Sequence, residues 1–292
     1  MPLAVAAIDE RALVFDCGGA SLIGVLSLRA GGCPSVGVIV VVGGPQTRVG
    51  SHRQFVHLGR AIAAAGHAAL RFDYRGMGDS PGAPGHFERV DDDIAAAIVA
   101  LQRACPSVRR VVLWGLCDGA SAALMYCQAR RDACVVGLAL ANPWVRSETG
   151  LARAQVKHYY LRRLREPAFW SKLLSGRVAS SAFGELRAAV AKSRQRSPTG
   201  ARATSAAVPK DFRTRMALGW QGFPGRLLLL LSGDDLVARE FVEATTHEAA
   251  WRAALAKPNV TRHDLPEADH TFSVISQRQH VEALTCAWLA TL

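Results

Sequence analysis

Apolar and polar residues follow one another along most of the chain in blocks that predict strands and helices in turn. Continuous apolar runs of strand length are typical of strands buried on both faces of a sheet, and apolar residues spaced three or four apart are typical of helices that cover it. The predicted strands are 12–17, 21–29, 36–42, 67–76, 111–114, 135–141, 227–231 and 259–265, and the predicted helices are 52–66, 91–104, 119–131, 240–257 and a last one ending at Leu289. Ser51 is the expected N-cap and Gly66 the expected stop of the first helix. The first two strands form a hairpin, and the βαβ units that follow predict an α/β fold with a mostly parallel, doubly wound sheet.

Residues 146–222 interrupt this rhythm. The segment is compatible with helices, rich in aromatic residues and without a strand-like run, and the strand pattern resumes at 227. We therefore predict a sheet domain made of 1–145 and 223–292, with 146–222 inserted as a helical lid.

The positive charge of the chain is concentrated in and next to this insertion. Of 35 Lys and Arg residues, 17 lie in 146–226 with only 4 of the 24 acidic residues, so this segment carries +13 and the remainder −2. Such a patch favours an anionic partner. Nucleic acid is not the expected one, because no helix-turn-helix, zinc-finger or RNA-binding motif accompanies the charge.

Composition narrows the class of protein further. Half of the 292 residues are hydrophobic and 20% are charged, which is enough for a sizeable core. No apolar run approaches the roughly 18 residues of a membrane span, and the first residues lack the basic start of a signal peptide. Seven cysteines without C-x-x-C spacing indicate neither a disulfide framework nor a zinc site. We expect a cytoplasmic protein without a metal or another cofactor.

One short motif carries the candidate nucleophile. In VLWGLCDGAS, Gly115 and Gly119 flank Cys117 between a predicted strand and a predicted helix. This is the G-x-Nuc-x-G layout of a nucleophile elbow, with cysteine where serine is usual. Small residues suit the tight turn, and the helix N-terminus stabilises a thiolate or an oxyanion. The competing interpretation is a small buried thiol in a turn.

A nucleophile needs a base, and the base needs an acid that orients it. The predicted strand 227–231 runs directly into Asp234 and Asp235, and the strand 259–265 is followed by His270. Because the carboxyl ends of parallel strands meet at one edge of the sheet, these groups are expected near Cys117. The chain order nucleophile, acid, histidine is the one found with a nucleophile elbow.

Together these stretches resemble the α/β-hydrolases. With GGPQTRVGSHRQF, RFDYRGMGDS, NPWVR, LSGDDL and EADHTFS added, the chain more narrowly resembles the exosortase A system-associated hydrolase 1 family, found beside exopolysaccharide and protein-sorting genes. The resemblance implies an α/β-hydrolase fold and hydrolase or acyl-transfer chemistry on an unassigned substrate. Its register favours Asp235 as the acid that orients His270, while Asp234, where a less acidic residue is usual, suits a turn.

The oxyanion hole requires two backbone donors. The N–H of Asp118, just after the nucleophile, is expected to be one. The second is expected from the loop after strand 36–42, where Pro45 has no N–H; this leaves Gly44 or Gln46, and we favour Gln46.

Four further residues are candidates for binding substrate. Arg48, His52 and Arg53 stand at the start of the first core helix and suit a phosphate or carboxylate, although solvated surface charge explains them equally. Trp144 is expected to line the acyl pocket or simply to pack the lid. The charged residues of RFDYRGMGDS are expected to form a structural loop network.

A cysteine nucleophile predicts a thioester acyl-enzyme, which leaves both hydrolysis and transfer open. The leading hypothesis is a Cys-His-Asp hydrolase or acyltransferase for an ester or thioester, with the basic lid recruiting an anionic substrate carried on coenzyme A or an acyl-carrier protein. The main alternative is a non-catalytic α/β-hydrolase-fold protein that binds a partner in an exopolysaccharide or protein-sorting system. A peptidase is compatible with the fold, but no amine-binding signature accompanies it.

Overall fold

The computed structural model describes residues 7–44, 46–83, 85–145 and 211–292. One eight-stranded sheet runs through these residues in the order β1-β2-β4-β3-β5-β6-β7-β8. Its strands are β1 (Ile8–Cys17), β2 (Ala20–Arg29), β3 (Val36–Val41), β4 (Ala68–Phe72), β5 (Arg110–Leu116), β6 (Val135–Ala141), β7 (Arg226–Asp234) and β8 (Val260–Asp269). The strands β4, β3, β5, β6, β7 and β8 are parallel to one another, whereas β1 and β2 form the predicted antiparallel hairpin.

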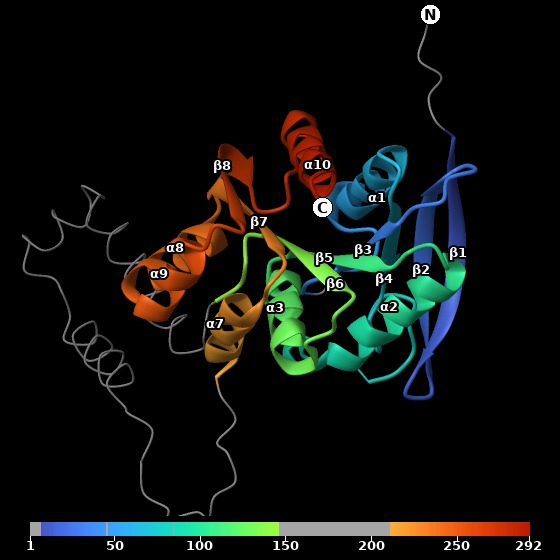
Figure 1. The fold of residues 1–292 in the computed structure, drawn as a ribbon, viewed down its shortest axis with the longest axis horizontal. Helices are drawn as coiled ribbons and strands as arrows, with labels where there is room; N and C mark the ends of the chain where they lie inside the picture. Colours follow the sequence, from blue (N-terminus) through green and yellow to red (C-terminus); the bar gives the residue numbers. More distant parts are fainter. Residues whose placement is uncertain (1–6, 45, 84, 146–210) are drawn as a thin grey trace, which may run out of the picture. The chain divides into compact units, whose positions relative to one another are not determined.

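Helices cover both faces of the sheet (Figure 1). The helices are α1 (Gln54–Ala64), α2 (Asp91–Ala104), α3 (Asp118–Arg130), α7 (Phe212–Gly222), α8 (Leu236–His247), α9 (Ala249–Leu255) and α10 (Ile275–Leu289), with short 3-10 turns η1 (Ser51–Arg53) and η2 (Phe87–Arg89). The helices α1 and α10 lie on one face, and α2, α3 and α7 lie on the other. The doubly wound α/β sheet predicted from the pattern is thereby confirmed.

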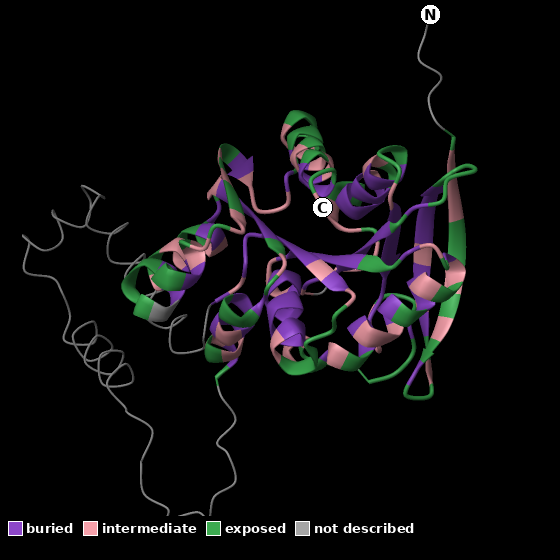
Figure 2. Ribbon diagram, viewed as in Figure 1, coloured by how far each residue is buried: buried purple, intermediate pink, exposed green. Residues whose placement is uncertain are grey.

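Two hydrophobic clusters hold these layers together, one on each face of the sheet. The strands β3 and β4 are buried along their whole length and β6 at every position but Val136, and Figure 2 shows that the sheet is covered by the inward faces of the helices. Side chains of parallel strands alternate between faces, so each strand supplies both clusters. In β5, for example, Leu113 joins the cluster under α3 and Trp114 joins the cluster under α1.

Two local predictions are wrong. The helix predicted at 240–257 is two helices, because Glu248 adopts an extended backbone between α8 and α9. Ser51 does not cap the first helix with its side chain; α1 begins after Arg53, which has a left-handed backbone. The stop at Gly66 agrees with its positive φ of 92°.

Most of the predicted lid, 146–210, lies outside the described residues. Its last part is described: α7 packs against α3, and Met216 and Trp220 are buried in the cluster under that helix. Among the described residues, no helix combines the length and the apolar character that crossing a bilayer requires.

Candidate active site

Cys117 stands at the sharp turn between β5 and α3. Its φ of 60° and ψ of −127° are unfavourable for a residue with a side chain. The backbone is held there from both sides: its N–H donates to Ala141 at 2.9 Å, and its carbonyl accepts from the N–H of Trp144 at 3.1 Å and of Ala120 at 3.1 Å. The fold therefore fixes the strained conformation, and presents the half-buried side chain at the carboxyl edge of the sheet.

The two glycines of the elbow are required by close packing. A Cβ at position 115 would stand 2.5 Å from the N of Ala120, and one at position 119 would stand 2.3 Å from the carbonyl oxygen of Val41. Both neighbours are backbone atoms and have little freedom to move. The spacing G-x-C-x-G is thus a consequence of the turn itself, as expected from the sequence.

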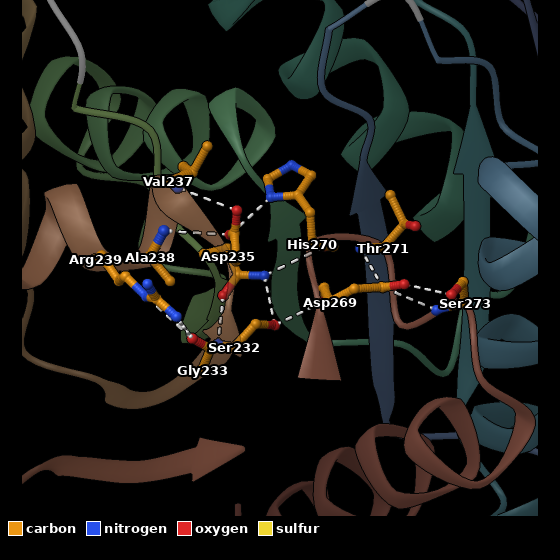
Figure 3. Close-up of polar contacts among 11 residues, drawn as sticks. Ser232, Gly233, Asp235, Val237, Ala238, Arg239, Asp269, His270, Thr271 and Ser273 are labelled. Atoms are coloured by element: carbon orange, nitrogen blue, oxygen red, sulfur yellow. Dashed lines mark hydrogen bonds and ion pairs between the residues drawn. The ribbon is translucent and has the colours of Figure 1, made fainter. Parts of the chain in front are cut away.

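Asp235 and His270 are in direct contact (Figure 3). The Nδ1 atom of His270 lies 2.8 Å from Oδ2 of Asp235. Asp235 is buried and caps α8, because its carboxylate accepts hydrogen bonds from the N–H of Val237 at 3.0 Å and of Ala238 at 3.2 Å. Asp234, the alternative acid, is exposed to solvent.

This contact sets the state of the imidazole. A carboxylate that faces Nδ1 favours a proton on that nitrogen, which leaves Nε2 as the acceptor on the opposite side of the ring. His270 is thereby prepared to take a proton at Nε2. Both residues follow strands parallel to β5, so they share an edge of the sheet with Cys117.

Sequence reasoning missed Asn142, which ties together the ends of three strands. It lies directly after β6, fully buried, and its amide donates to Ser232 Oγ at 2.9 Å and to the carbonyl of His270 at 3.2 Å. Its Oδ1 accepts the N–H of Ser232 at 2.8 Å, and Ser232 Oγ donates to the carbonyl of Asp269 at 2.9 Å. The network fixes the backbone on which the imidazole stands. The signal in the sequence was the position of Asn142 directly after a predicted strand, next to the elbow.

The loop after β3 contains both candidates for the second oxyanion donor, Gln46 and Gly44. The N–H of Gln46 donates to the carbonyl of Gly43 at 3.3 Å and closes a turn, so it is engaged within the loop. Gly44, the other candidate, has a positive φ of 55° and lines the cavity beside Cys117. The N–H of Gly44 in turn lies at the carboxylate of Asp118, so each candidate N–H has an acceptor within the protein, and the choice of Gln46 as the second donor stays a prediction.

Asp118 brings a carboxyl group to the same place. Its Oδ1 occupies the space that a side chain at position 43 would need, 2.1 Å from the Cβ position there, and has no hydrogen-bond partner among the described residues. Burial raises the pKa of Asp118, and the nearby backbone N–H groups of Gly44 and Gly119 offset part of that rise. An acidic group thus lies beside the nucleophile and beside the loop after β3, which we call the oxyanion loop.

Arg48 has a different role from the predicted one. Its guanidinium pairs with the fully buried carboxylate of Asp73 and with Asp79 at 2.5 Å, and its backbone N–H donates to Asp73 at 2.6 Å. The N–H of Asp79 also donates to Asp73, at 3.1 Å. Arg48 therefore ties the oxyanion loop to the loop after β4 and has no free guanidinium to offer an anion. The expected structural network of that second loop is present.

The other two basic candidates are exposed. His52 and Arg53 have left-handed backbones, with φ of 52° and 60°, at the entry to α1. The structure does not bring them to the cavity described next.

A cavity of about 480 Å³ opens beside Cys117. Trp144, predicted to line an acyl pocket, is part of its wall together with Val42, Met77 and Phe87. Its polar lining comes from Tyr74, His86, Cys117 and Asp118. A concave, mostly apolar space next to a nucleophile is typical of a substrate pocket. Over 7–44, 46–83, 85–145 and 211–292, no group of three or more His, Cys, Asp or Glu side chains is arranged to hold a metal ion.

Comparison with known proteins agrees with the fold. The model of the family described as serine aminopeptidase, S33, matches residues 34–273. An esterase of Pyrococcus furiosus superposes with a TM-score of 0.64 at 14% identity, over 97% of this chain and 91% of that chain. A thermophilic esterase of Thermogutta terrifontis gives 0.56 at 20% identity, over 96% and 98%. A putative alpha/beta hydrolase of Agrobacterium tumefaciens gives 0.58 at 15%, over 96% and 95%. At these identities the structures establish a shared α/β-hydrolase fold. No curated protein matches the chain.

Proposed function

The chain belongs to the serine aminopeptidase S33 family of α/β-hydrolases, and from that premise we propose that it is a cysteine-dependent hydrolase or acyltransferase for esters or thioesters. Cys117 is the nucleophile, His270 the general base and acid, and Asp235 the residue that orients the histidine. The backbone N–H groups of Asp118 and of the loop after β3, at Gln46 or Gly44, form the oxyanion hole.

The 2.8 Å contact between His270 and Asp235 carries this proposal. A buried carboxylate that also caps a helix is a rigid partner, and it leaves Nε2 as the basic atom. The strained backbone of Cys117 at the end of β5, in the same sheet, supports the same assignment, since strain of this kind concentrates at functional sites.

Acylation begins when Nε2 of His270 takes the proton of Cys117. The thiolate attacks the carbonyl carbon, forming a C–S bond, and the negative charge that develops on the carbonyl oxygen is stabilised by the N–H groups of Asp118 and of the loop after β3. His270 then passes its proton to the departing alcohol or thiol as the bond to that group breaks. The product is a thioester on Cys117.

Deacylation repeats these steps with a second nucleophile. Water, an alcohol, an amine or a thiol gives a proton to His270 and attacks the thioester, the C–S bond breaks, and the proton returns to the sulfur of Cys117. A thioester remains reactive toward acceptors other than water, and the choice of acceptor decides between hydrolysis and transfer.

The finer parts of the proposal rest on the sequence. The motifs resembling the exosortase A system-associated hydrolases support a cytoplasmic role beside exopolysaccharide or protein-sorting functions. The net charge of +13 over 146–226 supports an anionic carrier, either coenzyme A or an acyl-carrier protein, as the leaving group.

Two alternatives make different predictions. A non-catalytic protein that binds a partner in such a system would keep its biological activity after Cys117→Ala. An aminopeptidase, the activity in the family's name, would release 4-nitroaniline from aminoacyl anilides. The cysteine in place of serine favours acyl transfer from activated esters and thioesters, which are easier to cleave than amides.

The test is turnover of a panel of 4-nitrophenyl esters and acyl-coenzyme A thioesters, with and without added amine and alcohol acceptors. We expect release of the leaving group by the wild-type protein and its loss in Cys117→Ala. Cys33→Ser, a substitution of an exposed cysteine, is the matched control and keeps full activity. Absence of turnover with every substrate, or equal turnover by Cys117→Ala, would contradict the proposal.

A further inference from the structure

The two edge strands of the sheet differ in composition. At one edge, β8 carries Arg262, Asp264 and Pro266, and charged residues and proline along an edge keep it from pairing with another strand. At the other edge, β1 contains the continuous apolar run 12–15 and no proline (Figure 1). Within this run the side chain of Val14 is exposed, with 68% of its surface accessible. The edge at β1 therefore lacks the protection that β8 has.

The outer side of β1 presents backbone groups that can pair with a further strand. The N–H of Ala30 donates to the carbonyl of Ala7 at 2.9 Å, and β1 pairs with β2 from there to the hairpin turn without a bulge. Because hydrogen-bonded pairs alternate along an antiparallel ladder, the odd-numbered residues of β1 bond to β2 and the even-numbered ones direct their N–H and carbonyl groups away from it. Among the described residues, no strand lies beyond β1. Val14 is in the middle of this outward row.

A groove of about 750 Å³ follows the same edge between β1 and α2. Leu13 and Phe15 of β1 and Ala96 and Val99 of α2 are among the residues that line it. Val99 is exposed, as is Val14, which also lines the groove. An apolar groove beside an open strand edge is typical of a surface that binds another protein by strand addition.

We propose that a second copy of this chain pairs with β1, so that the two sheets become one across a twofold axis at Val14. When such an axis is perpendicular to the sheet, each face of one copy continues as the same face of the other. Antiparallel pairing then requires that residues opposite each other come from the same face, which Val14 opposite Val14 satisfies. This register sets Leu13 of each copy opposite Phe15 of the other, inside the joined grooves.

The charges of β1 are complementary to those of a second copy. Glu10 accepts hydrogen bonds from Arg60 at 3.0 Å and from Arg71 at 3.0 Å, so this cluster carries one positive charge in excess. Asp16, on the same face of β1, is exposed. In the proposed register Asp16 of each copy lies diagonally across from Glu10 of the other, where it meets the excess positive charge. A shift of the register by two residues would set Asp16 directly opposite Glu10, and like charges in that position repel.

The edge is large enough for a specific contact. A strand of ten residues is about 34 Å long, and a helix beside it is about 10 Å across. Strand and helix together offer roughly 500 Å² on each copy, or about 1,000 Å² in total, which is the lower end of the range for specific interfaces. We therefore expect a dimer that dissociates in the micromolar range.

Sedimentation velocity of the full chain over about 1 to 100 µM measures this equilibrium. We expect the wild-type protein to pass from one copy to two. In Val14→Lys the dissociation constant rises by about 100-fold or more, because two lysines then meet at the axis and lysine on an edge opposes pairing. Val274→Lys is the matched control, since Val274 is also an exposed valine but precedes α10, outside the sheet, and this variant dimerises like the wild-type protein. Circular dichroism establishes that both variants are folded.

A cross-link tests the register independently and applies even if Val14→Lys does not fold. Under mild oxidation Val14→Cys is expected to give a disulfide-linked dimer in which position 14 is joined to position 14, as mapped by mass spectrometry, whereas Val274→Cys gives no more cross-linking than the wild-type protein. A wild-type protein that stays monomeric at every concentration overturns the inference. So does a dimer that persists unchanged in folded Val14→Lys, because it then uses another surface, and so does the absence of a cross-link at position 14.

Discussion

The two halves of the candidate site are built in opposite ways. The acid–base half consists of Asp235 and His270 with their supports Asn142 and Ser232, and hydrogen bonds join all four residues. The acyl half consists of Cys117, Asp118, Gly44 and the cavity beside them, where Oδ1 of Asp118 and the hydroxyl of Tyr74 have no partner among the described residues.

The two halves differ in how far their polar groups are satisfied within the fold. Proton transfer needs a fixed imidazole, so its supports are satisfied within the fold. The acyl half instead contains buried polar atoms that have no partner among the described residues, and such atoms cost stability. Substitutions in the two halves are therefore expected to differ in the sign of their effect on stability as well as in their effect on rate.

His270→Ala gives the largest expected loss. Without the base, the rate of acylation falls by about 10³- to 10⁴-fold, because Cys117 must react without proton transfer to Nε2. Pre-steady-state release of 4-nitrophenol measures this step. His280→Ala, an exposed histidine of α10, is the control and keeps the wild-type rate. A loss of less than tenfold in His270→Ala would place the base elsewhere.

Asn142→Ala probes the support of the acid–base half. Losing the contacts to Ser232 and to the carbonyl of His270 lets the imidazole shift, and a misplacement of this kind lowers kcat by up to about 10²-fold. KM stays close to the wild-type value, since Asn142 does not line the cavity. Steady-state kinetics separate the two constants. An unchanged kcat with a changed KM contradicts the assigned positioning role.

Arg48→Met probes the loop that carries Gly44. We expect kcat to fall about tenfold as the oxyanion donor loses its support, and the free energy of unfolding to fall by about 3 kcal/mol because Asp73 loses its cation while buried. The double variant Arg48→Met/Asp73→Asn recovers stability without recovering kcat. If kcat recovers together with stability, Arg48 acts on folding alone.

Asp118→Asn has the smallest expected effect, and it raises the free energy of unfolding instead of lowering it. Burial raises the pKa of this carboxyl above its ordinary value of 3.8, so the folded state holds the proton more tightly than the unfolded state. The contribution of Asp118 to stability therefore decreases as the pH rises above 3.8. The variant is expected to be more stable than the wild-type protein at neutral pH. The difference in the free energy of unfolding increases as the pH rises above 3.8. Thermal unfolding across pH 4 to 8 measures it, and a variant less stable than the wild-type protein at pH 8 contradicts the account.

The fold followed from the sequence because parallel strands leave a strong pattern. Continuous apolar runs such as 36–42 and 135–141 form strands that are almost wholly buried between two layers of helices, as such runs predict. The sequence pattern does not reveal the break at Glu248, because the apolar residues on both sides of it keep the spacing of a single helix. The second of these helices, α9, packs against both α7 and α8, which a single straight helix would not allow.

The site was predictable where it depends on strand ends and not where it depends on loop geometry. The end of β7 and the end of β8 place Asp235 and His270 by topology alone. The choice between Gly44 and Gln46 depends on a turn closed by the carbonyl of Gly43, and the partner of Arg48 depends on a second loop 25 residues away in the chain. The spacing of residues along the chain predicts neither the donor nor the partner of Arg48.

Identification of the acylated residue tests the central claim most directly. The protein is mixed with an acyl-coenzyme A thioester or the 4-nitrophenyl ester of monomethyl glutarate, quenched in acid within milliseconds to seconds, digested and mapped by tandem mass spectrometry. The account predicts an acyl group on Cys117 that accumulates before product, is absent in His270→Ala, and does not appear on the exposed Cys33 of the same molecules. Acylation of Cys33 to the same extent, or turnover with Cys117 unmodified at every time, would contradict it.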